Sequence, residues 1–224
     1  MRRVESATGS EGSAADRAAF REVQAKLGQA FFTEKTRFPP SDLFGPLLHA
    51  PRVARGVLEL GGALRNLGGS ATGDGASLPE DVVEFVAFVV FARMHAEAVS
   101  RGRAFAYLRP MFNHLPRALH AGVRPEAIEA LRRGDDDALL PKERELAGFV
   151  RAVLDGSVDD AGWASMRDRL GTRRAIEAAS YALLDFFVCR LESVFGLQDA
   201  TEAELDALLK EAARGAPAAR DLSL

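Results

Sequence analysis

The stretch SLPEDVVEFVAFVVFARMHAEAVS, residues 77–100, decides the fold class of this chain. Ser77 and Glu80 form the S-x-x-E pattern of a capping box, and the proline between them suits the first turn of a helix, so a helix is predicted to begin here. The valines that follow could favour a strand. The length of the run and the capping signal favour a helix instead.

The rest of the chain repeats this helical pattern, with prolines near predicted helix starts and glycines just after predicted helix ends. Residues 68–75 are predicted to form a flexible loop, and no stretch of the chain shows the period-two alternation of a half-buried strand. The predicted fold class is therefore all-α. Further predicted helices cover residues 20–31, 51–64, 106–121, 125–133, 141–155, 157–170, 172–195 and 201–215.

The composition indicates a folded chain with balanced charge. Of 224 residues, 47% are hydrophobic, 29 are basic and 32 are acidic, for a net charge of −3. This balance gives no field that attracts nucleic acid or an anionic membrane. No apolar run reaches the roughly 18 residues of a membrane span. The N-terminus lacks the apolar core of a secretory signal, and the single Cys189 fits a reducing compartment, so a cytoplasmic protein is expected.

Glu84 carries the clearest chemical signal. It is the exception among the eleven otherwise apolar residues from Val82 to Ala92, in a helix that is apolar on every side and therefore expected to be buried. Burial raises the pKa of a carboxyl group toward the range useful for proton transfer. The alternative is a structural glutamate bound to a neighbouring arginine or backbone group, and the residues alone leave both interpretations open.

His114 is the second candidate, in the predicted helix over residues 106–121. Arg109 and Arg117 flank it in sequence, and an arginine beside a histidine suits a substrate carboxylate, although a lone helical histidine is more often structural. The four histidines show none of the HxxxH, HExxH or ExxH spacings of metal sites. No glycine-rich phosphate loop is present either, so neither a metal nor a cofactor is predicted.

Three stretches, taken together with their order along the chain, resemble the carboxymuconolactone decarboxylase family, which includes the alkylhydroperoxidase D-like proteins. LPEDVVEFVAF (78–88) is similar to the family's LPxRxxELVIL segment, and HLPRALHAGVRPEAIEALRRG (114–134) to its HxxxALxAGxxxEEI segment. DLFGPLLHAPRVARGVLELGGALRN (42–66) looks like its entry helices. The resemblance covers about residues 42–198. It implies an alkylhydroperoxidase D-like helical bundle that assembles as a homo-oligomer.

The resemblance matches Glu84 to the glutamate of the family's core helix and His114 to the histidine of its active-site helix. The family's residues before that histidine read CxxC or CxYEWxxH, whereas this chain has YLRPMFNH (107–114), with Tyr107 at the first cysteine position. The spacing from the glutamate to the histidine is longer than in the family by about three helical turns. A later placement of the insertion puts Ala96 at the cysteine position, and neither placement supplies a thiol. Because the thiolate is the nucleophile in peroxide reduction, the chain is a divergent member not expected to inherit peroxidase activity.

Three hypotheses about function follow. The first is a cysteine-independent lyase or isomerase acting on a small carboxylate or lactone by proton transfer, with Glu84 and His114 as catalytic residues and Tyr107, Arg109 and Arg117 as substrate-binding residues. Such chemistry needs a cation for the carboxylate and a proton donor for the developing enolate. The second is a catalytically inactive member that binds a ligand or partner. The third, ranked lowest, is a peroxidase that uses an external thiol.

The predicted organisation has four parts. A disordered arm covers residues 1–13 and a helical extension covers residues 14–76. The family-like domain covers residues 77–198, and a C-terminal helix and tail cover residues 199–224.

Overall fold

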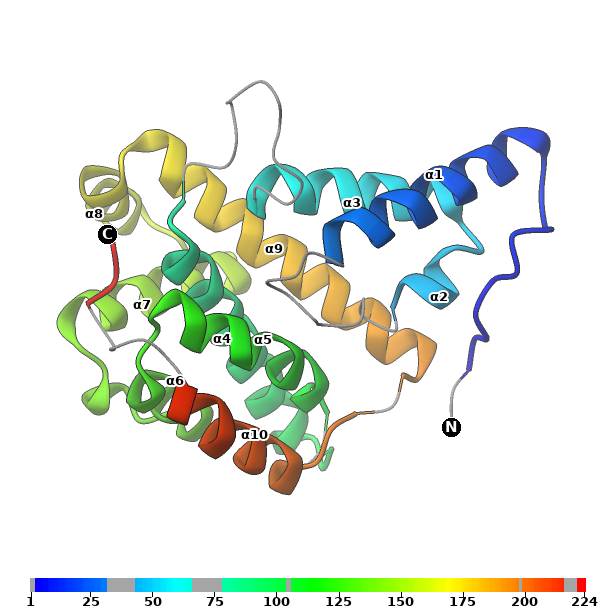
Figure 1. The fold of residues 1–224 in the computed structure, drawn as a ribbon. Helices are drawn as coiled ribbons and strands as arrows, with labels where there is room; N and C mark the ends of the chain where they lie inside the picture. The colour runs from blue at the N-terminus through cyan, green and yellow to red at the C-terminus, as the bar shows by residue number, and fades with distance from the viewer. Residues whose placement is uncertain (1–2, 32–42, 66–77, 104–105, 198, 216–220) are drawn as a thin grey trace. The chain divides into compact units, whose positions relative to one another are not determined.

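The computed structural model describes residues 3–31, 43–65, 78–103, 106–197, 199–215 and 221–224. The described residues are helical and contain no strand, which confirms the all-α prediction (Figure 1). The predicted loop over residues 68–75 lies outside them. The helices are α1 (Ala14–Phe31), α2 (Phe44–Leu47), α3 (Pro51–Arg65), α4 (Glu80–Ser100), α5 (Leu108–Ala121), α6 (Pro125–Arg133), the 3-10 turn η1 (Asp136–Ala138), α7 (Pro141–Asp155), α8 (Asp160–Leu170), α9 (Thr172–Phe195) and α10 (Glu202–Gly215).

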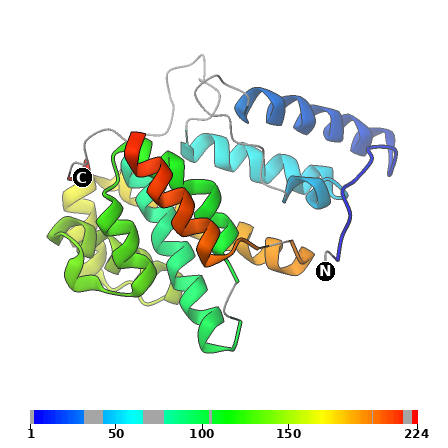
Figure 2. The same ribbon diagram turned by 60° about the horizontal axis from the view of Figure 1, so that its bottom comes forward.

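The chain divides into two compact units, one of residues 1–76 and 190–198 and the other of residues 77–189 and 199–224. In the first unit, α1 and α3 run side by side, and the short α2 also packs on α3 (Figure 2). The residues before α1 are tied into this unit by their backbone, because the N–H of Arg3 donates to Phe195 O and that of Ala7 donates to Gly45 O.

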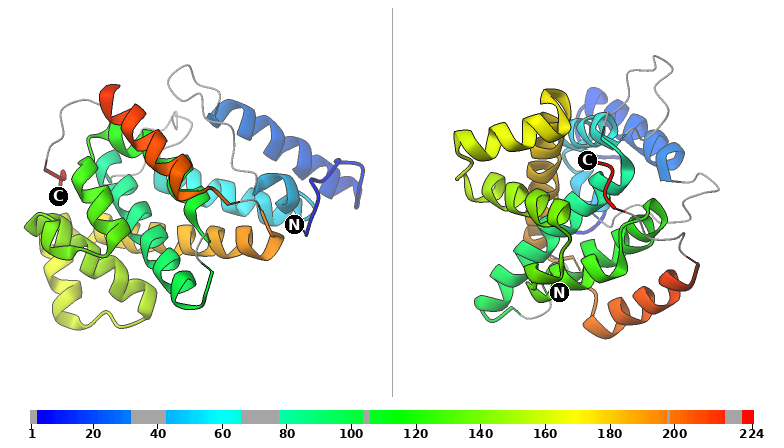
Figure 3. Two further views of the ribbon diagram at one scale, coloured as in Figure 1. Left: turned by 90° about the horizontal axis from the view of Figure 1, so that it is seen from below. Right: turned by 90° about the vertical axis from the view of Figure 1, so that its left-hand side faces the viewer.

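Helix α4 forms the core of the second unit. Every residue from Asp81 to Ala92 is buried, as the apolar sequence predicts, and α4 packs against α5, α6 and α7. Helix α8 continues this unit beside α7, and α10 lies along α5 (Figure 3). None of the described helices combines the length and the apolar character that a membrane crossing requires.

The sequence of this unit has an S-x-x-E pattern at residues 77–80 and a T-x-x-E pattern at residues 201–204, and the two helix starts differ in the structure. At the start of α10, Thr201 Oγ1 donates to Glu204 Oε2 and accepts from the Glu204 N–H, which forms a capping box. Helix α4 begins only at Glu80, its N-cap Pro79 has no side-chain capping bond, and Ser77 lies outside the described residues. The nearby Leu78 N–H instead donates to Glu177 on α9, at 3.1 Å.

Candidate functional site

The two residues predicted to be catalytic meet in the second unit. Glu84 on α4 places Oε2 2.8 Å from Nδ1 of His114 on α5. The Glu84 side chain is 3% exposed and the His114 side chain 17% exposed, so the contact lies at the edge of the core. Phe91, two turns along α4 from Glu84, packs its ring edge-on against the imidazole with 5.0 Å between centroids. One helix therefore fixes the imidazole by both a hydrogen bond and a ring contact.

This geometry distinguishes the two ring nitrogens of His114. A glutamate carboxylate is an acceptor only, so a proton on Nδ1 lets the imidazole donate to it. The tautomer is then fixed, and Nε2 is the nitrogen through which the ring takes up or releases a proton. The pair is thus arranged as an acid–base group with a carboxylate partner.

The three predicted substrate-binding residues lie at different places around α5. Arg117 follows His114 by three residues, about 60° round the helix, and is half-buried. Arg109 precedes His114 by five residues, about 140° round the helix. Its guanidinium lies over the Phe112 ring at 5.2 Å and also contacts the Asp199 carbonyl. Tyr107 is the N-cap of α5. The structure therefore places Arg117, and not Arg109, on the His114 side of the helix.

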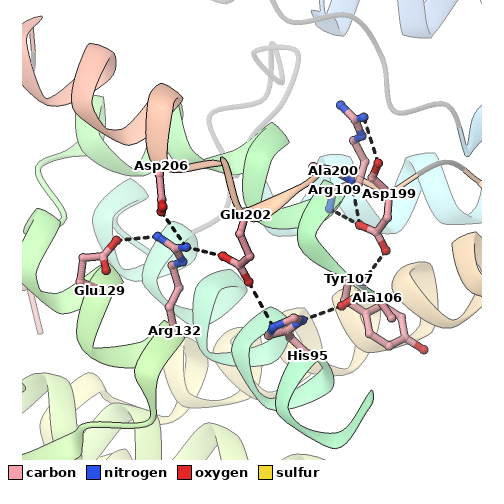
Figure 4. Close-up of polar contacts among 10 residues, drawn as sticks. All are labelled: His95, Ala106, Tyr107, Arg109, Glu129, Arg132, Asp199, Ala200, Glu202 and Asp206. Carbon is pink, nitrogen blue, oxygen red and sulfur yellow. Dashed lines mark hydrogen bonds and ion pairs between the residues drawn. The ribbon is translucent and has the colours of Figure 1, made fainter. Parts of the chain in front are cut away.

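The N-terminus of α5 is closed by Asp199, a residue that sequence reasoning missed. Its carboxylate accepts hydrogen bonds from the backbone N–H groups of Tyr107, at 2.6 Å, and Arg109 (Figure 4). Tyr107 has φ +69°, a left-handed conformation that is uncommon for a residue other than glycine. The Asp199 carboxylate holds this unusual turn in place by satisfying the donors at the helix end.

Burial raises the pKa of Asp199 above its ordinary value, because desolvation outweighs the hydrogen bonds from the backbone of Arg109, Tyr107 and Ala200, which lower it. The positive end of the α5 dipole therefore already faces an internal carboxylate.

A second group of charges lies nearby around Arg132. The Arg132 guanidinium pairs with Glu129, Glu202 and Asp206, and Glu202 also lies 3.5 Å from Nε2 of His95 (Figure 4). Burial acts to lower the pKa of Arg132, but the hydrogen bonds to the α10 carboxylates outweigh it and raise the pKa. A cavity of about 310 Å³ borders these residues. The Arg132 guanidinium that lines this cavity is paired with acidic side chains on α6 and α10. The clearest role of these ion pairs is to hold α10 on the unit.

Cys189 is 1% exposed on α9, a position typical of an inert thiol. Within the part of the chain that the structure describes, no three His, Cys, Asp or Glu side chains are grouped in a way that could hold a metal ion.

One solved structure is similar to this chain over nearly its whole length. It is the crystal structure of an alkylhydroperoxidase AhpD core, an uncharacterized peroxidase-related protein from Ralstonia eutropha JMP134. The TM-score is 0.61 at 17% sequence identity, over 91% of this chain and 94% of that chain. The likeness shows that this chain has the alkylhydroperoxidase D-like fold, as predicted. No protein-family model and no curated protein matches the sequence.

Proposed function

We propose that this protein is a cysteine-independent lyase or isomerase that transfers a proton on a small carboxylate or lactone. The observation that supports the proposal is the 2.8 Å contact between the buried Glu84 carboxylate and Nδ1 of His114. A carboxylate that orients a histidine and stabilises its charged form is a recurring arrangement for general acid–base catalysis.

In an isomerisation, Nε2 of His114 takes the proton from the carbon beside the substrate carbonyl. The electrons of the broken C–H bond pass into the carbonyl group as an enolate, and Glu84 stabilises the imidazolium that forms. Nε2 then returns the proton to another carbon of the enolate. In a decarboxylation, His114 begins as the imidazolium. The bond to the carboxylate breaks first, so that carbon dioxide leaves and the electron pair of this bond passes into the neighbouring carbonyl group as an enolate. Nε2–H then protonates the carbon left behind.

Arg117 is the proposed partner of the substrate carboxylate, because it lies one turn from His114 on the same side of α5. An arginine fork binds a carboxylate through two parallel hydrogen bonds and fixes its orientation. The backbone N–H groups of Tyr107 and Arg109 already donate hydrogen bonds to the Asp199 carboxylate. Contacts of their side chains with a substrate remain a prediction.

A thiol-dependent reaction has less support. The one cysteine is buried in the second unit, and the N-terminus of α5 is occupied by Asp199. A thiolate is stabilised by a helix N-terminus or a neighbouring cation, and a carboxylate in that place has the opposite effect.

The proposal is tested by proton exchange in D2O. The full chain is incubated with a panel of small unsaturated lactones that carry a carboxylate, and ¹H NMR follows the loss of signal from the protons beside the carbonyl. His114→Ala is expected to slow exchange by about 10²–10⁴-fold, the usual contribution of a positioned acid–base group. Glu84→Gln is expected to slow it less, because the amide still accepts a hydrogen bond from Nδ1.

His95→Ala is the matched control, since it removes another largely buried imidazole of the same unit and should leave the exchange rate unchanged. Full turnover by the His114→Ala variant would rule out the proposal. If no substrate of the panel exchanges with the wild-type protein, and both variants lose only stability, the result favours a catalytically inactive protein that binds a ligand or partner.

A further inference from the structure

Residues 3–13, which precede α1, follow a defined path along the first unit. The N–H of Ala7 donates to Gly45 O at 2.9 Å. Gly9 has φ +81°, and a Cβ atom at this position would lie 2.5 Å from Cε1 of Phe20 on α1. Only glycine lets the backbone pass so close to that ring in this conformation. The segment is therefore shaped to pack on α1.

His49, between α2 and α3, contacts this segment through both of its ring nitrogens. Nδ1 lies 2.8 Å from Glu11 Oε2, and Nε2 lies 3.0 Å from the backbone carbonyl oxygen of Glu5. A carboxylate and a carbonyl group both accept hydrogen bonds and have no proton to donate. Both hydrogen bonds therefore form together only when the imidazole carries a proton on each nitrogen, which is its charged form. A neutral ring donates one of them and turns a lone pair toward the other oxygen.

We propose that His49 is a pH-sensitive catch, which holds residues 3–13 on the first unit at low pH and loosens them as the pH rises and the imidazole loses its proton. The segment forms one wall of a cavity of about 280 Å³, through Gly9, Glu11 and Gly12. Loosening the segment opens this cavity. Because both ring nitrogens are bound to the segment, the imidazole serves to hold it and not to act on a substrate.

The other charged groups around His49 keep their charge between about pH 5.5 and 8, the range in which histidine is the usual switch. Asp16 on α1 and Arg52 on α3 line the same cavity, with 3.3 Å between Oδ1 and Nε. Hydrogen bonds from Ser13 lower the pKa of Asp16, so its carboxylate stays charged. Arginine keeps its proton in proteins, glutamate in general titrates at about pH 4.3, and α2 carries no titratable side chain. Among the described groups here, the imidazole is therefore the one that changes charge.

The exposure of the catch sets the size of the expected effect. The side chains of His49 and Glu11 are 42% and 48% exposed, so water screens their attraction. Loss of the proton is expected to weaken the docking of the segment about fivefold, the effect of one hydrogen bond at the surface. The bond from Arg17 Nη1 to Gly12 O, at 2.6 Å, keeps its donor in this range. Docking is therefore reduced by the rise in pH and not abolished.

Solvent exchange of the Ala7 N–H, measured by NMR on the full chain, tests the proposal. This hydrogen is protected while the segment is docked, and its protection factor corrects for the intrinsic pH dependence of exchange. The wild-type protection factor is expected to fall about fivefold between pH 5.5 and pH 8. Gly9→Ala should lower it at both pH values, because the added Cβ atom collides with the Phe20 ring.

Two further substitutions separate the catch from other causes of a pH effect. His49→Gln, which stays neutral, should give the lower protection factor at both pH values. Glu11→Gln should keep the higher one at both, because an amide offers Nδ1 either an acceptor or a donor. His120→Gln is the matched control, since His120 is an exposed histidine of the second unit, and it should leave the wild-type fall unchanged.

The proposal is overturned by a wild-type protection factor that is equal at the two pH values. It is also overturned if the fall persists in His49→Gln, because another group then controls the docking of the segment.

Discussion

Among the described residues of the second unit, two pairs bring an imidazole into contact with a carboxylate, and the pairs differ mainly in the carboxylate. His114 and His95 are similarly buried, with side chains 17% and 13% exposed. Glu84 is 3% exposed and lies 2.8 Å from its histidine, whereas Glu202 is 45% exposed and lies 3.5 Å from its own. An ion pair that includes a solvated carboxylate is screened by water and salt. Burial of the acid, more than of the base, therefore separates a contact that is shielded from water from a contact that water screens.

The largest expected difference between these two pairs is in stability. His114→Ala is expected to lower the free energy of unfolding by about 3 kcal/mol, because it removes the imidazole from a buried carboxylate. His95→Ala should cost less than about 1 kcal/mol through its exposed partner Glu202. Urea denaturation followed by circular dichroism measures both values. Equal losses would show that the exposure of the carboxylate does not govern the strength of the two contacts.

Asp199 differs from both acids in its partners, because its partly buried carboxylate accepts hydrogen bonds from backbone N–H groups in place of an imidazole. Asp199→Ala is expected to lower the free energy of unfolding by about 2 kcal/mol, since it leaves buried donors at the N-terminus of α5 unsatisfied. Asp199→Asn should cost less, because its side-chain carbonyl still accepts a hydrogen bond. Urea denaturation of the two variants gives this difference.

The pH dependence of stability provides the check on Asp199. Its pKa in the folded protein is raised above the ordinary value of 3.8, so the folded state holds the proton more tightly than the unfolded chain does. The stability contribution of Asp199 is therefore greatest below pH 3.8 and falls as the pH rises through the folded pKa. Asp199→Asn should remove this fall. An unchanged pH profile in the variant would mean that burial does not raise the pKa of Asp199.

The comparison also shows which contacts could be predicted from the sequence. Glu84 and His114 could each be singled out from the sequence, Glu84 as a lone carboxylate in an apolar helix and both through the family resemblance, but the sequence did not show that their side chains meet. The capping box of Thr201 and Glu204 was predictable, since both partners lie within one turn of the chain. These signals are local, or are carried by a motif.

The contacts that the sequence did not reveal are long-range. Asp199 reaches the N–H of Tyr107 across 92 residues, and its only local feature is its position just before a helix. Glu177 binds the Leu78 N–H across 99 residues, near the place where a local cap by Ser77 was predicted. In each case a backbone donor is satisfied by a distant carboxylate that the fold brings near. Sequence spacing has no information about such a partner.

The smallest expected effect belongs to the outer pair and depends on salt. Glu202→Gln removes a charge shared by His95 and Arg132, but Arg132 keeps its contacts with Glu129 and Asp206. The loss in unfolding free energy should be about 0.5 kcal/mol at low ionic strength and should fade in 1 M salt, where the screening length is about 3 Å. The loss from His114→Ala should persist in the same salt, because water and ions do not reach the Glu84 carboxylate. Urea denaturation at both salt concentrations compares the two variants. If salt reduces both losses in the same proportion, solvent reaches both carboxylates, and the buried acid that the proposed proton transfer requires is absent.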